Sequence, residues 1–139
     1  MAESRFSLGI ETFRKVDPES ASTLVDNLKD ISPELARFTI EFGYGDVMSR
    51  PGLDLQSREL LTIAMLGAMG NAPLQLETHI NGALTVGASM EQIVEVILQI
   101  AVFAGFPAAY NAIMAATKVF RSRKSPRPSS GEDAASVPR

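Results

Sequence analysis

The sequence predicts an all-α fold: a single-domain bundle of about six to seven helices that is an obligate oligomer. Apolar residues recur at helical spacing along most of the chain, and no β-branched alternation bounded by hairpin turns is present. Proline and glycine divide the chain into helix-length segments. Two long segments, residues 60–76 and 96–117, contain no charged residue. With 139 residues, 45% of them hydrophobic, the chain suits one domain with a real core.

The first half of the chain is predicted to form three helices followed by a loop. Residues 4–16 carry apolar residues at the spacing of one helix face, namely Phe6, Ile10 and Phe13. Asp17-Pro18 and Ser32-Pro33 each place an N-cap residue before a proline at the first helical position, so a helix is expected to begin at each. The second of these helices is expected to cover "ELARFTIEFGYGDVM". Pro51-Gly52 then breaks the chain into a loop over residues 49–54.

The second half is predicted to form four more helices. Ser89 is a suitable N-cap for one of them, with Glu91 in its first turn, where a carboxylate is favoured. Glycines end the first three helices, and a proline opens the fourth. The expected segments are 55–70, 73–87, 90–104 and the stretch that begins at Pro107.

The uncharged segments 60–76 and 96–117 predict contact between copies of the chain. A surface helix of a small monomer shows a polar face, and these helices show none. A membrane span is the competing interpretation, but Gly105-Phe106-Pro107 divides the longer segment, and polar Gln99 and Asn111 lie inside its halves. A domain of this size encloses few whole helices, so we expect a homo-oligomer and no membrane partner.

Composition excludes several classes of function. No cysteine is present, so disulfides, thiolate metal sites and thiol nucleophiles are absent. The net charge of −3 is not the excess of positive charge that a nucleic-acid-binding protein carries. One histidine and scattered carboxylates do not make a metal shell, so no metal is expected. The first residues lack the pattern of a secretory signal, so a cytoplasmic protein is expected.

The chain divides into a helical domain over residues 1–121 and a tail over residues 122–139. Proline, serine and glycine dominate the tail, which is therefore expected to be disordered. Its basic stretch "RSRKSPR" is interpreted as a solvated segment rather than a site for an anionic surface.

Two stretches together resemble the carboxymuconolactone decarboxylase family over roughly residues 38–120. They are "GDVMSRPGLDLQSRELLTIAMLGAMG" and "LETHINGALTVGASMEQIVEVILQIAVFAGFPAAYNA". The resemblance lies in the "GDV" and "RPGL" loop, the "REL" that opens the next helix, the E-x-H of Glu77 and His79, and the Phe103–Ala109 junction. It implies an alkylhydroperoxidase D-like helical fold and assembly into trimers or hexamers.

The alkylhydroperoxidase D-like branch of this superfamily uses C-x-x-C followed by histidine as a redox centre. The matching stretch here is "NAPLQLETH", which contains no thiol. A peroxidase or disulfide reductase would therefore lack its nucleophile.

The decarboxylase branch implies proton chemistry without a cofactor. A carboxylated lactone loses CO₂, and its own conjugated system receives the electrons. His79 is then the general acid/base, because its ordinary pKa of about 6.5 lies near working pH. The resemblance indicates Glu59 as its partner. Arg50 and Arg58 are candidates for the substrate carboxylate, with Arg50 preferred because it lies in the "SRPGL" loop.

Each candidate also has a structural interpretation. Glu59 lies in a first helical turn, where the helix dipole favours a carboxylate. Glu77 lies two residues from His79, so on a helix it points away and is interpreted as an exposed or interface residue. Arg58 could be solvated surface. Phe103, together with Phe106 and Tyr110, is expected to form core or the wall of the substrate pocket. Phe103 stands where the family usually has tyrosine, and Gln99 where it often has histidine.

The leading hypothesis is a cofactor-independent lyase resembling 4-carboxymuconolactone decarboxylase, which acts on a small carboxylated lactone bound at a subunit interface. One alternative is a tailoring enzyme of a biosynthetic pathway that uses the same proton chemistry. A second alternative, from another class, is a non-catalytic oligomeric binding protein.

Overall fold

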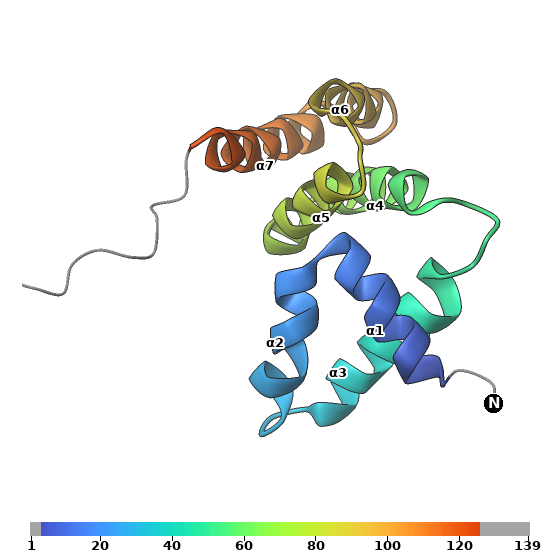
Figure 1. Cartoon of the computed structure of the whole chain (residues 1–139). Coiled ribbons are helices and arrows are strands. Elements are labelled where there is room, and N and C mark those ends of the chain that lie inside the picture. The colour runs from blue at the N-terminus through green and yellow to red at the C-terminus, as the bar shows by residue number, and fades with distance from the viewer. Residues whose placement is uncertain (1–3, 126–139) are drawn as a thin grey trace, which may run out of the picture.

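The computed structural model describes residues 4–125, and all regular structure in that range is helical. This confirms the all-α prediction. Figure 1 shows the first three α-helices and a π-helix as an N-terminal layer, with the next two helices beside it and the last two helices beyond those. In order, the elements are α1 (Arg5–Val16), α2 (Pro18–Leu28), α3 (Pro33–Phe38), η1 (Thr39–Met48), α4 (Leu55–Met69), α5 (Pro73–Thr85), α6 (Met90–Ala104) and α7 (Phe106–Lys124).

The sequence predicted one helix where the structure has α3 followed by the π-helix η1. The turns of a π-helix are wider than those of an α-helix, and π-helical turns are often found at functional sites. The widening occurs where α1 packs very closely on η1. A Cβ on Gly45 would lie 2.6 Å from the Arg5 carbonyl oxygen, and one on Gly9 would lie 2.0 Å from the Ile40 carbonyl oxygen. Local helix propensity carries no information about a contact between distant segments, so the sequence pattern predicted a regular α-helix here.

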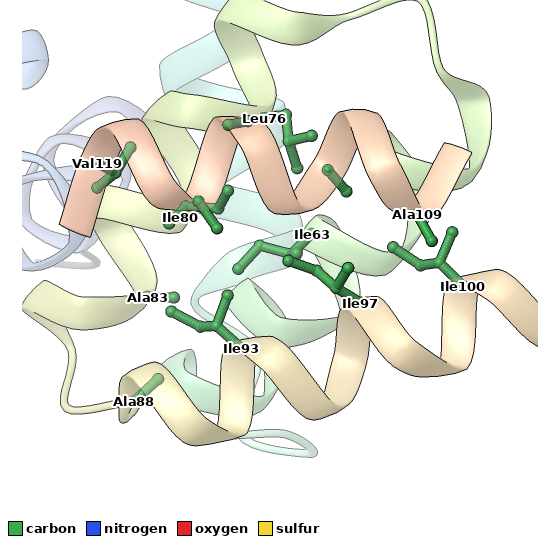
Figure 2. Packing of buried hydrophobic residues seen from close by; sticks show 13 residues of the cluster. Ile63, Leu76, Ile80, Ala83, Ala88, Ile93, Ile97, Ile100, Ala109 and Val119 are labelled. Atoms are coloured by element: carbon green, nitrogen blue, oxygen red, sulfur yellow. The ribbon is translucent and has the colours of Figure 1, made fainter. Parts of the chain in front are cut away.

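The main core lies among α4, α5, α6 and α7 (Figure 2). Isoleucines on one face of α6 point at the other three helices, and alanines on α7 allow close packing. The buried cluster includes Ile63, Leu76, Ile80, Ile93, Ile97, Ile100, Ala112 and Ala116. The predicted caps of this half are present: Ser89 forms a capping box with Gln92, and Gly70 ends α4 with φ of 71°.

Helix α7 continues to Lys124, beyond the boundary at residue 121 that the sequence predicted for the helical domain. The Arg123 guanidinium explains the extra turn, because it donates to Asn81 Oδ1 at 2.7 Å, the Asn81 carbonyl at 2.8 Å and Thr85 Oγ1 at 2.7 Å on α5. The rest of the predicted disordered tail, residues 126–139, lies outside the described residues.

The uncharged segments leave large apolar side chains exposed on α4, α6 and α7. These side chains are Leu61, Met65, Met69, Leu98, Val102, Phe103, Phe106, Tyr110 and Met114, which we call the apolar face. Over residues 4–125, no helix combines the length and the apolar character needed to cross a bilayer. One copy of the chain does not bury the apolar face, and the homo-oligomer stays a prediction.

Candidate active site

A buried carboxylate–imidazole pair lies between two neighbouring helices, α4 and α5. Glu59 lies in the first turns of α4, and His79 lies in the middle of α5. The distance between Glu59 Oε2 and His79 Nδ1 is 2.8 Å. Glu59 is fully buried, and the His79 side chain is 18% exposed. The family resemblance predicted this pairing, and the fold brings the two side chains together.

The packing around Glu59 fixes its carboxylate. Gly82, one turn after His79 on α5, leaves room for it, since a Cβ there would lie 3.0 Å from Glu59 Oε2 and 2.8 Å from Val16 Cγ1. Glu59 Oε1 is buried and has no hydrogen-bond partner among the described residues. The bond to His79 is therefore the main polar contact of this carboxylate within the described part of the chain. It also directs the other ring nitrogen, Nε2, away from Glu59, because the two nitrogens lie on different edges of the imidazole ring.

His79 lines a hollow of about 810 Å³ between α5 and the N-terminal layer. Apolar and aromatic side chains form most of its wall, with neutral polar groups among them. The lining residues are Phe13, Ser20, Leu24, Asn27, Leu28, Leu35, Thr39, Gly43, Tyr44, Met48, Leu74, Gln75, Thr78 and His79. A hollow of this size and composition is suited to a small organic molecule held in a poorly hydrated place.

Tyr44 on η1 is a candidate that the sequence analysis missed. Its ring stacks on Phe13 with centroids 4.0 Å apart and planes 13° apart, and the residue is 8% exposed. Burial, followed by the negative charges of Glu59 and Asp17, raises the pKa of Tyr44 above its ordinary value. The phenol therefore keeps its proton and can act as a hydrogen-bond donor. The available signal was an aromatic residue between two glycines, in "GYG", just before the "DV" of the family motif.

The two arginines lie elsewhere in the single chain. Arg58 donates from Nε to the Leu53 carbonyl at 3.2 Å and from its guanidinium to the Arg50 carbonyl at 3.0 Å. It thus holds the loop before α4 in place, a role that the sequence analysis did not consider. Arg50 is exposed and lines a separate hollow of about 310 Å³ together with Lys15. Neither arginine lines the hollow at His79, and their role in carboxylate binding stays a prediction.

Glu77 and the two aromatic candidates also lie away from His79. Glu77 pairs with Lys118 Nζ at 2.7 Å, which agrees with the expectation that it points away from His79. Phe103 is 84% exposed and lines an apolar groove of about 370 Å³ between α4 and α6. Tyr110 is 66% exposed on α7. Both belong to the apolar face, so a role as pocket wall would require a second copy of the chain.

Among residues 4–125, no three His, Asp or Glu side chains are grouped so that they could hold a metal ion. The chemistry that the described site offers is proton transfer at His79, with Glu59 behind it and a phenol donor in the same wall.

Comparison with known proteins agrees with the resemblance seen in the sequence. A model of the "Carboxymuconolactone decarboxylase family" matches residues 33–118. The chain is 33% identical over 120 residues to a 4-carboxymuconolactone decarboxylase of Acinetobacter baylyi, which covers 86% of this chain and 89% of that protein. It is 31% identical over 113 residues to an uncharacterized 15.0 kDa protein of Paracoccus denitrificans, covering 81% and 84% of the two chains. It is also 36% identical over 78 residues to a nitrosuccinic acid decarboxylase of Metarhizium robertsii, covering 56% and 54%.

Proposed function

The chain belongs to the carboxymuconolactone decarboxylase family, and we propose that it is a cofactor-independent carboxy-lyase acting on a small carboxylated lactone. The observation that carries the proposal is the Glu59–His79 pair at the wall of the large hollow. Two relatives named as decarboxylases support the reaction class. The substrate itself rests on the similarity to the Acinetobacter protein alone.

The reaction needs an electron acceptor, and an unsaturated lactone supplies its own. When the bond to the carboxylate breaks, CO₂ leaves and the bonding electrons move through the conjugated C=C to the lactone carbonyl, which becomes a dienolate. A proton then adds to carbon and restores the lactone. The net change is loss of CO₂ and uptake of one proton, so no oxidant or reductant is consumed.

His79 supplies this proton in the proposed mechanism. Glu59 Oε2 accepts from Nδ1–H and keeps the ring in one orientation, so that Nε2 carries the transferable proton. A protonated His79 beside the Glu59 carboxylate forms a pair with no net charge. The mostly apolar wall of the hollow favours loss of CO₂, because it solvates the reactant carboxylate poorly while the dienolate spreads its charge.

The test is turnover of 4-carboxymuconolactone, followed by lactone absorbance and by CO₂ release. His79→Ala is expected to lower kcat about 10²- to 10⁴-fold, the usual contribution of a positioned general acid. Glu77→Gln is the matched control, because Glu77 lies two residues away on the same helix and pairs outward with Lys118. Full activity in His79→Ala, or an equal loss in both variants, would contradict the role of His79.

A second candidate substrate is a nitro acid, and the similarity to the nitrosuccinic acid decarboxylase of Metarhizium robertsii favours it. A nitro group next to the scissile bond accepts the electrons as a nitronate, and the same proton donor completes the reaction. Such a substrate would fit a tailoring role in a biosynthetic pathway. Parallel assays with both acids separate the two functions, and binding without turnover of either would favour a non-catalytic binding protein.

We also propose that copies of the chain associate through the apolar face. Its side chains come from three helices and include Phe103 and Tyr110, so burial there would carry these aromatic candidates into an interface. Val102→Asp is expected to lower the molar mass measured by light scattering, because a charge in an apolar interface is costly. Val25→Asp, on α2 and outside the apolar face, is the control. Unchanged mass in Val102→Asp would locate the contact elsewhere.

A further inference from the structure

The proposed reaction leaves one task unassigned, which is to stabilise the negative charge that develops on the substrate's carbonyl oxygen. His79 delivers the proton to carbon and cannot also hold the oxygen at another end of the substrate. The donor for that oxygen must line the same hollow as His79 and must be free to bond to a ligand. It must also be held rigidly, since stabilisation of a developing charge depends on donors that are already in position.

Several polar groups line the hollow, and most of them fail one of these conditions. The hydroxyls of Thr39 and Thr78 donate to carbonyls of their own helices, at 2.8 Å and 3.0 Å. Asn27 and Gln75 are exposed, so water competes for them and their side chains are free to rotate. Ser20 is half-buried near the start of α2, and no hydrogen bond among the described residues holds its hydroxyl in one rotamer, so it does not meet the condition of rigidity.

Tyr44 meets all of the conditions. The stack on Phe13 covers a face of its ring and holds the side chain in one place. Its hydroxyl makes no hydrogen bond to any described residue. It is not fully buried either, in contrast to Glu59 Oε1, which is buried without a partner. The hydroxyl is therefore partly accessible, and Tyr44 lines the same hollow as His79.

We propose that the Tyr44 hydroxyl donates a hydrogen bond to the substrate's carbonyl oxygen and stabilises the dienolate formed when CO₂ leaves. This inference rests on the proposed function and names a second catalytic residue for it. Tyr44 keeps its proton throughout. The bond that breaks joins the carboxylate to carbon, its electrons move to the carbonyl oxygen, and the proton that adds to carbon comes from His79 Nε2.

The neighbouring charges favour a phenol that donates rather than ionises. Glu59 and Asp17 both act on Tyr44, and each negative charge raises the pKa of the phenol, as burial does. An ionised tyrosine would repel the dienolate. These surroundings keep the hydroxyl neutral.

The first experiment compares Tyr44→Phe with Tyr44→Leu. Phenylalanine keeps the ring stacked on Phe13 and removes the hydroxyl alone, whereas leucine also removes the stack. For Tyr44→Phe we expect kcat to fall about 10²- to 10³-fold while KM changes less than about threefold, as for loss of one donor to a developing oxyanion. If Tyr44 has a structural role, Tyr44→Phe keeps full kcat and only Tyr44→Leu is impaired. That outcome overturns the inference and leaves the proposed decarboxylase intact.

The second experiment does not depend on turnover. The chain has two tyrosines and no tryptophan, so in a Tyr110→Phe background Tyr44 is the only tyrosine that absorbs. The probe is γ-carboxy-γ-butyrolactone, a saturated lactone acid that cannot pass its electrons to the carbonyl. We expect it to shift the Tyr44 absorption band to longer wavelength, as a phenol does when it donates to a carbonyl. No shift under saturating probe overturns the inference.

The two experiments separate failure of this inference from failure of the proposed function. If the wild-type chain does not turn over 4-carboxymuconolactone, the proposed substrate is wrong, and the absorption shift alone decides whether Tyr44 meets a ligand carbonyl. If the chain does turn over the lactone, full kcat in Tyr44→Phe overturns the inference, and a fall in kcat together with the absorption shift supports it. A hydroxyl that serves Glu59 instead of a substrate could also lower kcat, but it would give no absorption shift on adding the lactone, so the shift separates these two roles.

Discussion

Replacing His79 with alanine is expected to destabilise the fold as well as to slow the reaction. Glu59 is 0% exposed, its Oε2 bonds to His79 Nδ1 at 2.8 Å, and its Oε1 has no partner within residues 4–125. His79→Ala would leave this carboxylate buried without its hydrogen bond. Removing one member of a buried charged pair costs about 3–5 kcal/mol. The His79 side chain is 18% exposed, and water can enter from that side, so we expect the lower end, about 3 kcal/mol.

A double-mutant cycle isolates the contribution of the pair. Urea unfolding is measured for the wild type, His79→Ala, Glu59→Gln and the double variant, at one protein concentration because an oligomer's stability depends on it. The double variant has no uncompensated charge, so it should be more stable than the two separate losses predict. We expect a coupling energy of about 1–2 kcal/mol between the two positions.

Two results would refute this reasoning. A loss below about 0.5 kcal/mol in His79→Ala, within the range of an ordinary surface substitution, would mean that Glu59 does not depend on His79. Strict additivity in the cycle would mean that the two side chains do not interact. Glu77→Gln is the control, since its exposed partner Lys118 limits that pair to about 0–1 kcal/mol.

Two further predictions concern the fold. Gly9→Ala is expected to lower the free energy of unfolding in urea by about 3 kcal/mol, because its Cβ would lie 2.0 Å from the Ile40 carbonyl oxygen. Gly43→Ala is the control, because a Cβ there would have nothing within 4 Å, and it should stabilise the fold by about 0.5–1 kcal/mol. Equal effects of the two substitutions would contradict the close approach of α1 to η1. Hydrogen bonds from Ser57 lower the pKa of Asp54 in the folded chain. The ionised carboxylate therefore stabilises the fold at pH values above the unfolded pKa of about 4, and this stabilisation is lost as the pH falls through the lowered pKa. The urea midpoint of Asp54→Asn should therefore fall less than that of the wild type between about pH 7 and pH 3.

Much of the fold could be predicted because its boundaries depend on local chemistry. Asp17 caps α2 by accepting from the Ser20 N–H at 3.0 Å, and Pro18 occupies the first position, as the dipeptide indicated. Gly70 adopts the left-handed conformation that ends α4. Signals of this kind lie within a few residues of the boundary they set, so a single sequence contains them.

The π-helix and the role of Arg58 could not be predicted in this way. The widening of η1 accompanies close contact with α1, which is far from it in sequence, and the Arg58 guanidinium depends on the path of the loop before α4. For the candidate site, periodicity could exclude Glu77 as the partner of His79, but only the family resemblance suggested Glu59. Tyr44 could not be predicted as a site residue, because its position beside the hollow depends on the stack with Phe13, which is distant in sequence.

The Glu59–His79 pair and part of the wall of the hollow come from different segments of the chain, so the two can be altered separately. Glu59 and His79 belong to one helical hairpin, α4 and α5, which lies inside the family match over residues 33–118. Helices α1 and α2 precede that match, yet they supply Phe13 and four more residues of the wall. Substitutions at these wall positions can therefore reshape the hollow while the Glu59–His79 pair keeps its own two helices. Exchanging the wall residues of this N-terminal segment for those of a relative would change the shape of the hollow and leave both members of the pair in place.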